Sequence, residues 1–113
     1  MYFFVMGNLS GRQQGIQAGH AALEYVDKYP DSITRDFIKN HKTFIVLDGG
    51  PSGAMLDHMN ELEDLKIDYA EFREPDLNNS VSAIAFLVSE ADYDDEDINE
   101  VKQYIKRFKL ASN

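Results

Sequence analysis

The chain has 113 residues, of which 43% are hydrophobic and 27% charged, and it contains no cysteine. These values are typical of one globular domain, so we expect a single domain over residues 1–113, without disulfides or thiolate metal sites. The formal net charge is −9, but seven acids fall within residues 90–100 and leave −2 for the remainder, so a locally basic face is compatible with the sequence.

The chain opens with a predicted strand and a long predicted helix. Residues 2–6 are aromatic or β-branched and apolar on both faces, which is typical of a central strand in a sheet covered on both sides. Ser10 and Gln13 then fit a capping box at the start of a helix. We expect this helix to run to Tyr29, because Pro30 disfavours its continuation.

Further along, hydrophobic periods of two or of about 3.6 residues define the remaining elements. These are a short helix at 31–40, strands at 42–47, 67–72 and 82–88, and helices at 51–66 and 98–108. Strand–helix–strand units imply parallel neighbours, whereas the close third and fourth strands fit either an antiparallel pair or separated neighbours. We therefore expect an α/β fold of three layers, α/β/α, with a four-stranded mixed sheet.

The first predicted helix carries a polar stripe beside an apolar one. The polar residues recur at i, i+4, i+7 and i+11, and they are Gln13, Gln17, His20 and Glu24. The apolar stripe, which we predict to pack against the sheet, consists of Ile16, Gly19, Leu23 and Val26. His20 lies at the border, where it either packs and donates one hydrogen bond or reaches a ligand.

The segment from Leu9 to Ala22 resembles the signature of type 2 peptidyl-tRNA hydrolases. In that family a strand runs into a turn and a helix that carries a glutamine, two small residues and His-Ala. Gln17 and His20-Ala21 have the same separation in this chain. The order of elements also agrees with the family, so the resemblance covers essentially the whole chain.

A second part of the resemblance lies in residues 73–85, which are similar to the family's loop and final strand. Arg73 aligns with the loop arginine, Ser80 with the first threonine, and Ser82 with the threonine that opens the strand. Where the family has lysines in its first turn, this chain has Gly11 and Gln13, which leaves Arg12 as the cation between them. The family's loop aspartate falls near Ala70 or Glu71, so Glu71, Glu74 or Asp76 has to take its place.

The resemblance implies hydrolysis of the ester that joins a peptide to the terminal ribose of tRNA. The implied catalytic residues are His20, Gln17, Ser82 and Asp76, and the implied substrate-binding residues are Arg12, Gln13, Arg73 and Ser80. Such a reaction needs an activated water and donors for the tetrahedral oxyanion, and we expect no metal or other cofactor. The partner would be peptidyl-tRNA, and the resemblance also suggests a homodimer.

The alternative is a catalytically inactive relative that binds a protein or an RNA end, which the replaced lysines and the acidity favour. The apolar runs are far shorter than the roughly 20 residues of a membrane span, so we expect no membrane partner. The N-terminus also has no basic segment of the kind that opens a signal peptide, and we expect a cytoplasmic protein.

Overall fold

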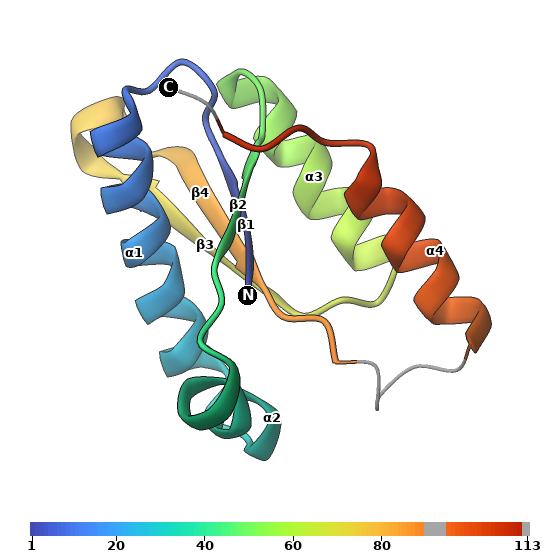
Figure 1. The fold of residues 1–113 in the computed structure, drawn as a ribbon. Coiled ribbons are helices and arrows are strands. Elements are labelled where there is room, and N and C mark those ends of the chain that lie inside the picture. Colours follow the sequence, from blue (N-terminus) through green and yellow to red (C-terminus); the bar gives the residue numbers. More distant parts are fainter. Residues whose placement is uncertain (90–94, 112–113) are drawn as a thin grey trace.

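The computed structural model describes residues 1–89 and 95–111, so part of the acidic run, residues 90–94, lies outside the described residues. The elements in chain order (Figure 1) are β1 (Tyr2–Val5), α1 (Gly11–Lys28), α2 (Ser32–Asp36), a π-helical turn η1 (Phe37–His41), β2 (Ile45–Asp48), α3 (Ser52–Asp64), β3 (Tyr69–Glu74), a 3-10 turn η2 (Pro75–Leu77), β4 (Ser80–Phe86) and α4 (Asp95–Lys106). The predicted order of helices and strands is confirmed, and the observed strand ends differ from the predicted ones by at most three residues.

The four strands form one mixed sheet in the order β2-β1-β4-β3. β1 runs parallel to β2 and antiparallel to β4, and β4 pairs antiparallel with β3. The predicted four-stranded mixed sheet is therefore confirmed, and the third and fourth strands are antiparallel neighbours. Between them the chain reverses at Asn78 and Asn79, whose φ angles of 56° and 58° lie in the left-handed region that asparagine tolerates.

Apolar side chains on the two faces of the sheet belong to two separate clusters, because side chains alternate along a strand. Phe4 of β1 packs with residues of α3 and α4, such as Met55 and Val101. Phe3 and Val5 pack on the opposite side with residues of α1. Figure 1 shows the same arrangement, with α1 on one side of the sheet and α3 and α4 on the other.

The predicted packing face of α1 is wrong. Ile16 and Leu23 are 51% and 70% exposed. The residues that α1 buries are Gln14, Gln17, Ala18, Ala21 and Tyr25. The sheet beneath α1 is lined by the short side chains of Ala70, Ala83 and Ala85, so alanines of the helix, and not its larger apolar residues, allow the close approach.

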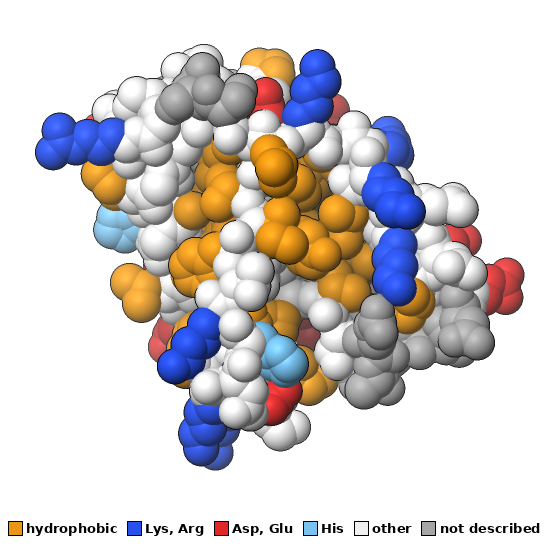
Figure 2. Space-filling view, viewed as in Figure 1, with side chains coloured by type: hydrophobic (Ala, Val, Ile, Leu, Met, Phe, Trp, Pro, Cys, Tyr) orange, Lys and Arg blue, Asp and Glu red, His pale blue; other side chains and the backbone are white. Residues whose placement is uncertain are grey.

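β2 is the edge strand nearest the C-terminal segment. The backbone N–H of Asp48 donates to the carbonyl of Lys109 at 2.8 Å, and Ala111 donates to Val46 at 2.9 Å, so residues 109–111 cover part of that edge. Figure 2 shows hydrophobic side chains gathered over this region, and Phe44 and Leu110 are among the exposed ones. Among the described helices, none has the length and apolar character that crossing a membrane requires.

Candidate functional site

Gln17 of α1 and Ser82 of β4 are in direct contact beneath the helix. Both are buried, with 7% and 0% of their surface exposed. The Ser82 hydroxyl donates to the Gln17 side-chain carbonyl, and the backbone carbonyl of Phe72 lies 3.3 Å from the same hydroxyl. The two residues that the resemblance placed in one site therefore lie on the same side of the sheet.

A shift in strand register explains how Ser82 comes to face α1. Phe72 pairs with Ala83, but the next residue, Arg73, pairs with Val81, so β4 has one extra residue at Ser82. Such a bulge interrupts the strict alternation of side chains. Val81 packs with the α3 and α4 cluster, whereas Ala83 packs with the α1 cluster, and Ser82 between them faces α1.

Glu74, at the end of β3, extends the hydrogen-bonded chain. The amide nitrogen of Gln17 donates to one carboxylate oxygen of Glu74 at 2.9 Å, and the backbone N–H of Asp76 donates to the other at 3.3 Å. These two hydrogen bonds, the one from Gln17 first, lower the pKa of Glu74, and the charge of nearby His20 lowers it further. Glu74 is therefore held as a carboxylate that orients the Gln17 amide.

His20 lies at the rim of this cluster, one turn beyond Gln17 on α1. Its side chain is exposed, and its ring stacks on Phe72 of β3 with 4.5 Å between ring centroids. The stacking fixes the plane of the imidazole while leaving its edge accessible to water. We refer to Gln17, His20, Glu74 and Ser82 as the α1–β4 cluster.

The start of α1 is fixed by local hydrogen bonds that set the position of Gln17. Ser10 caps the helix by accepting from the backbone N–H of Gln13 at 3.2 Å, as the capping box predicts. Gln14 is buried and its amide nitrogen lies 3.5 Å from the carbonyl of Met6, while the N–H of Met6 donates to the carbonyl of Ser82. The helix start is thus tied to both β1 and the bulged part of β4.

The other predicted site residues lie around this cluster, and none of their side chains joins its hydrogen bonds. Arg12 and Gln13 are exposed in the first turn of α1, and Ser80 is half-buried two residues before Ser82. Arg73 forms an ion pair with Glu71 at 2.8 Å and also contacts the carbonyl of Asn79. Asp76 contributes its backbone N–H to Glu74, while its own side chain is exposed.

Sequence reasoning named Glu74 as one of three acids but did not select it, and it did not foresee the role of Phe72. The selection depends on strand register, because Glu74 ends β3 opposite Ser80 and so lies under the first turns of α1. Phe72 carried no motif signal, although its position two residues before Glu74 places both side chains on one face of a regular strand.

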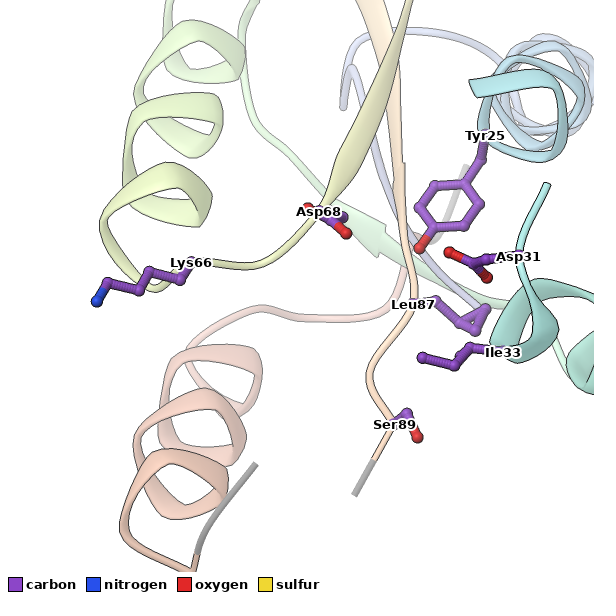
Figure 3. A pocket seen from close by; sticks show the side chains of 7 residues that line it. All are labelled: Tyr25, Asp31, Ile33, Lys66, Asp68, Leu87 and Ser89. Carbon is purple, nitrogen blue, oxygen red and sulfur yellow. The ribbon is translucent and has the colours of Figure 1, made fainter. Parts of the chain in front are cut away.

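Two features elsewhere in the described part of the chain are less suited to chemistry. A cavity of about 270 Å³ (Figure 3) lies among Tyr25, Asp31, Ile33, Lys66, Asp68, Leu87 and Ser89. Its polar groups come from four separate segments, and Figure 3 shows Lys66 directed away from the other side chains. Asp31 already caps α2 through Thr34 at 2.9 Å. It lacks an arranged donor set for one ligand.

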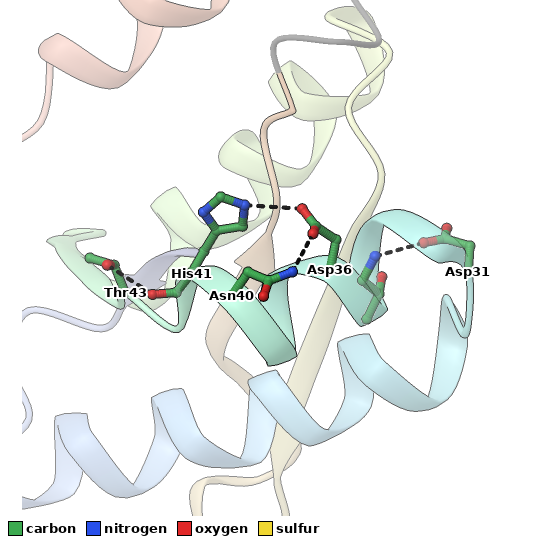
Figure 4. Close-up of polar contacts among 6 residues, drawn as sticks. Asp31, Asp36, Asn40, His41 and Thr43 are labelled. Atoms are coloured by element: carbon green, nitrogen blue, oxygen red, sulfur yellow. Dashed lines mark hydrogen bonds and ion pairs between the residues drawn. The ribbon is translucent and has the colours of Figure 1, made fainter.

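The second feature is the His41–Asp36 pair at η1 (Figure 4), with 3.0 Å between the imidazole Nε2 and the carboxylate. Asn40 donates to the same carboxylate at 2.7 Å, and these two hydrogen bonds lower the pKa of Asp36. Both side chains of the pair are more than half exposed, so the contact ties down an exposed helical turn. Within residues 1–89 and 95–111, no group of three acids or histidines is placed to hold a metal ion.

Comparison with known proteins adds no assignment. No family model matches the chain. No curated protein matches it either.

Proposed function

We propose that this chain is a divergent relative of type 2 peptidyl-tRNA hydrolases, with a three-layer α/β/α fold, and that it hydrolyses the ester between a peptide and tRNA. The observation that carries the proposal is the hydrogen-bonded chain from Ser82 through Gln17 to Glu74, beside the exposed ring of His20. The bulge that turns Ser82 toward α1 adds support, because bulges are over-represented next to active sites.

The cluster divides the work between buried and exposed groups. Ser82 is fully buried and its proton is donated to Gln17, so it is a positioning residue rather than a nucleophile. Gln17 has a second amide hydrogen, which is a suitable donor for a developing oxyanion when Glu74 fixes the amide plane. His20 is the proposed general base, since its imidazole is accessible at the rim.

In the proposed reaction, the oxygen of a water molecule attacks the ester carbonyl carbon while His20 takes one proton from that water. The tetrahedral oxyanion accepts a hydrogen bond from the amide of Gln17. Collapse of the intermediate breaks the bond to the ribose oxygen, which takes the proton back from the imidazolium. The immediate products are a peptide carboxylic acid and a free ribose hydroxyl on the tRNA. The acid then releases its proton to water at neutral pH, so atoms and charges balance without a cofactor.

The start of α1 suits the phosphates next to the ester. Arg12 is exposed there, and the first turn of the helix contains no acid, so the guanidinium and the positive end of the helix dipole act together. Arg73 is held by Glu71 and would contact substrate only by exchanging that partner. A tRNA substrate also implies that the protein acts in the cytoplasm.

The second candidate is a relative that binds tRNA or a protein without catalysis. The observation that favours it is that Gln17 and Ser82 are both buried and hydrogen-bond to each other. Neither residue lines any of four well-formed cavities in the described part of the chain, which lie near Tyr25, Glu61, Met1 and Asp48. In this case His20 and Arg12 would form a binding surface, and affinity for tRNA would fall steeply with salt.

A single-turnover assay distinguishes the two candidates. Purified protein in excess is mixed with peptidyl-tRNA, and released peptide is measured against buffer alone. We expect His20→Ala to lower the rate by about 10²–10⁴-fold, the usual contribution of a general base. His41→Ala is the matched control, because His41 is also exposed but belongs to η1, and it should leave the rate unchanged.

The role of the Glu74 carboxylate is tested in the same assay. Glu74→Gln removes the charge that fixes the Gln17 amide and should lower the rate, whereas Asp76→Asn keeps the backbone N–H and should not. Wild-type protein that releases no more peptide than buffer would contradict the hydrolase proposal. Equal rates for the His20→Ala and His41→Ala variants would contradict the role of His20 as the general base.

A further inference from the structure

Helices α3 and α4 lie together on the face of the sheet opposite α1 (Figure 1), and a cavity of about 410 Å³ opens between them. Its described lining carries three carboxylates, those of Glu61 and Asp64 on α3 and of Glu100 on α4. The same lining carries one guanidinium, that of Arg107 just after α4, so its net charge is negative. Because the α1–β4 cluster lies on the other face of the sheet, this cavity takes no part in the proposed hydrolysis.

The acids continue along both helices beyond the cavity. On α3, Asp57 precedes Glu61 by one turn, and it is exposed. On α4, the exposed Glu96 precedes Glu100 by one turn in the same way. Acids four residues apart lie on the same side of a helix and repel each other. These rows therefore weaken the helices that carry them, whereas a bound cation would be attracted by both rows.

Tyr104 of α4 places an unused hydroxyl at the same cavity. Tyr104 is 5% exposed and lines the cavity, and its hydroxyl has no hydrogen-bond partner among the described residues. Burial raises the pKa of Tyr104, the charge of Glu61 raises it further and that of Arg107 lowers it, so the hydroxyl lies near the charged groups of the cavity. A buried hydroxyl without a partner destabilises a fold, and phenylalanine would fill the same space. The hydroxyl therefore fits a ligand that donates hydrogen bonds.

The position of Arg107 shows that a cation is accommodated here. Its guanidinium carbon lies 5.8 Å from the ring centroid of Tyr104 and 5.8 Å from that of Phe108. One of its nitrogens lies 3.4 Å from a carboxylate oxygen of Glu61. Aromatic faces and a carboxylate are the groups that hold organic cations in proteins. The side chain of Arg107 is 64% exposed and its ion pair is long, so another cation can displace it.

We propose that the cavity between α3 and α4 binds a small linear polyamine, whose ammonium groups pair with the carboxylates of the cavity and donate a hydrogen bond to the Tyr104 hydroxyl. Ammonium groups donate hydrogen bonds and accept none, which matches a site built from carboxylate and phenol oxygens. Leu65 also lines the cavity and provides an apolar surface for the alkyl segments of the ligand. The volume lies within the range of about 300–1,000 Å³ that is usual for small-molecule sites.

Isothermal titration calorimetry of the full chain with spermidine at low ionic strength is the direct test. We expect one spermidine per chain, with an affinity that falls as salt is added, because salt screens exposed charges. Hexaamminecobalt(III) carries the same charge in a compact shape without alkyl segments, and it should bind more weakly. If it binds as tightly as spermidine, cations are attracted diffusely and the proposal is wrong. A blocked tetralysine peptide that binds more tightly than spermidine would overturn the assignment to a small molecule in favour of a protein partner.

Tyr104→Phe is the sharpest variant, because it removes the hydroxyl and changes no charge. It should weaken spermidine binding about tenfold, the usual effect of losing a hydrogen bond to a charged group. Its melting temperature should not fall, because the hydroxyl has no partner in the fold. A Tyr104→Phe variant that binds spermidine as tightly as the wild-type chain would refute the proposed site.

Charge variants with matched controls locate the site. Glu61→Gln should weaken binding about fivefold, whereas Glu24→Gln, the same change on the exposed face of α1, should have little effect. Arg107→Gln should strengthen binding about two- to fivefold, because it removes the competing cation, and Lys106→Gln beside it is the control. Equal losses for Glu61→Gln and Glu24→Gln would contradict the proposal, since only the net charge would then matter. Circular dichroism of each variant excludes unfolding as the cause.

Discussion

Replacing Ser82 by alanine isolates the hydrogen bond that joins β4 to α1. Ser82 is fully buried and Gln17 is 7% exposed, so water does not readily replace the lost donor. The Gln17 carbonyl then lacks its partner, and an unsatisfied buried polar group destabilises a protein by about 1–3 kcal/mol. At about 2.1 cal/mol/K per residue, the unfolding entropy of 113 residues is about 240 cal/mol/K, so Tm should fall by about 4–12 °C.

Urea unfolding at neutral pH measures this change, and Ser80→Ala two residues earlier on the same strand is the control. We expect that control to change the free energy of unfolding by less than about 0.5 kcal/mol. A double-mutant cycle with Gln17→Leu should give a coupling of about 0.5–3 kcal/mol, because both variants remove the same contact. A Ser82→Ala variant as stable as the Ser80→Ala control, or effects that simply add, would refute the reasoning.

Three further predictions follow from the same contacts. Folding lowers the pKa of Glu74, so the stabilisation by its carboxylate is complete above the ordinary pKa of 4.5 and is lost as pH falls below that value. Glu74→Gln should therefore reduce the loss of stability at acid pH, measured by urea unfolding. Burial, together with the hydrogen bond to Glu63, raises the pKa of Tyr69 to about 12 from 10, so stability should be lost as pH rises from 10 to 12. Tyr69→Phe should reduce that loss in urea unfolding measured across the same pH range, and part of the loss should remain because burial also raises the pKa of Tyr104. Gly7→Ala should destabilise the fold by about 1–3 kcal/mol, because the new Cβ atom at position 7 would lie 2.3 Å from a carboxylate oxygen of Asp48. Adding Asp48→Ala to this variant should recover part of the lost stability in thermal melts.

The strands and helices were predictable because their signals are local. Residues 2–6 are apolar on both faces, and β1 is indeed central, with buried side chains on both sides. Ser10 and Pro30 bracket α1 correctly, since capping and chain termination depend on neighbouring residues alone. The predicted strand ends were less accurate, because hydrogen bonding to the neighbouring strand determines where a strand begins and ends.

The orientation of α1 was not predictable from hydrophobicity. The usual rule turns the largest apolar residues inward, which selected Ile16 and Leu23 for the packing face and placed Gln17 on the polar stripe. The rule fails here because the face of the sheet that α1 packs against consists of alanine side chains and contains two hydrogen-bonding partners for the glutamines of α1, the Met6 carbonyl and the Ser82 hydroxyl. Which face of the helix is buried is thus set by the surface it meets.

The candidate site depends on the bulge in β4 at Ser82, where strict alternation of side chains predicts the wrong direction for the serine. In a regular strand Ser82 would share the face of Ile84 and would point toward α3, away from Gln17. The resemblance to type 2 peptidyl-tRNA hydrolases led us to expect Ser82 and Gln17 in one site, and in the structure it is the bulge in β4 that brings the two side chains together. Periodicity therefore misplaces Ser82, because the register of β4 against β3, which decides the direction of this side chain, depends on residues that are distant in the sequence.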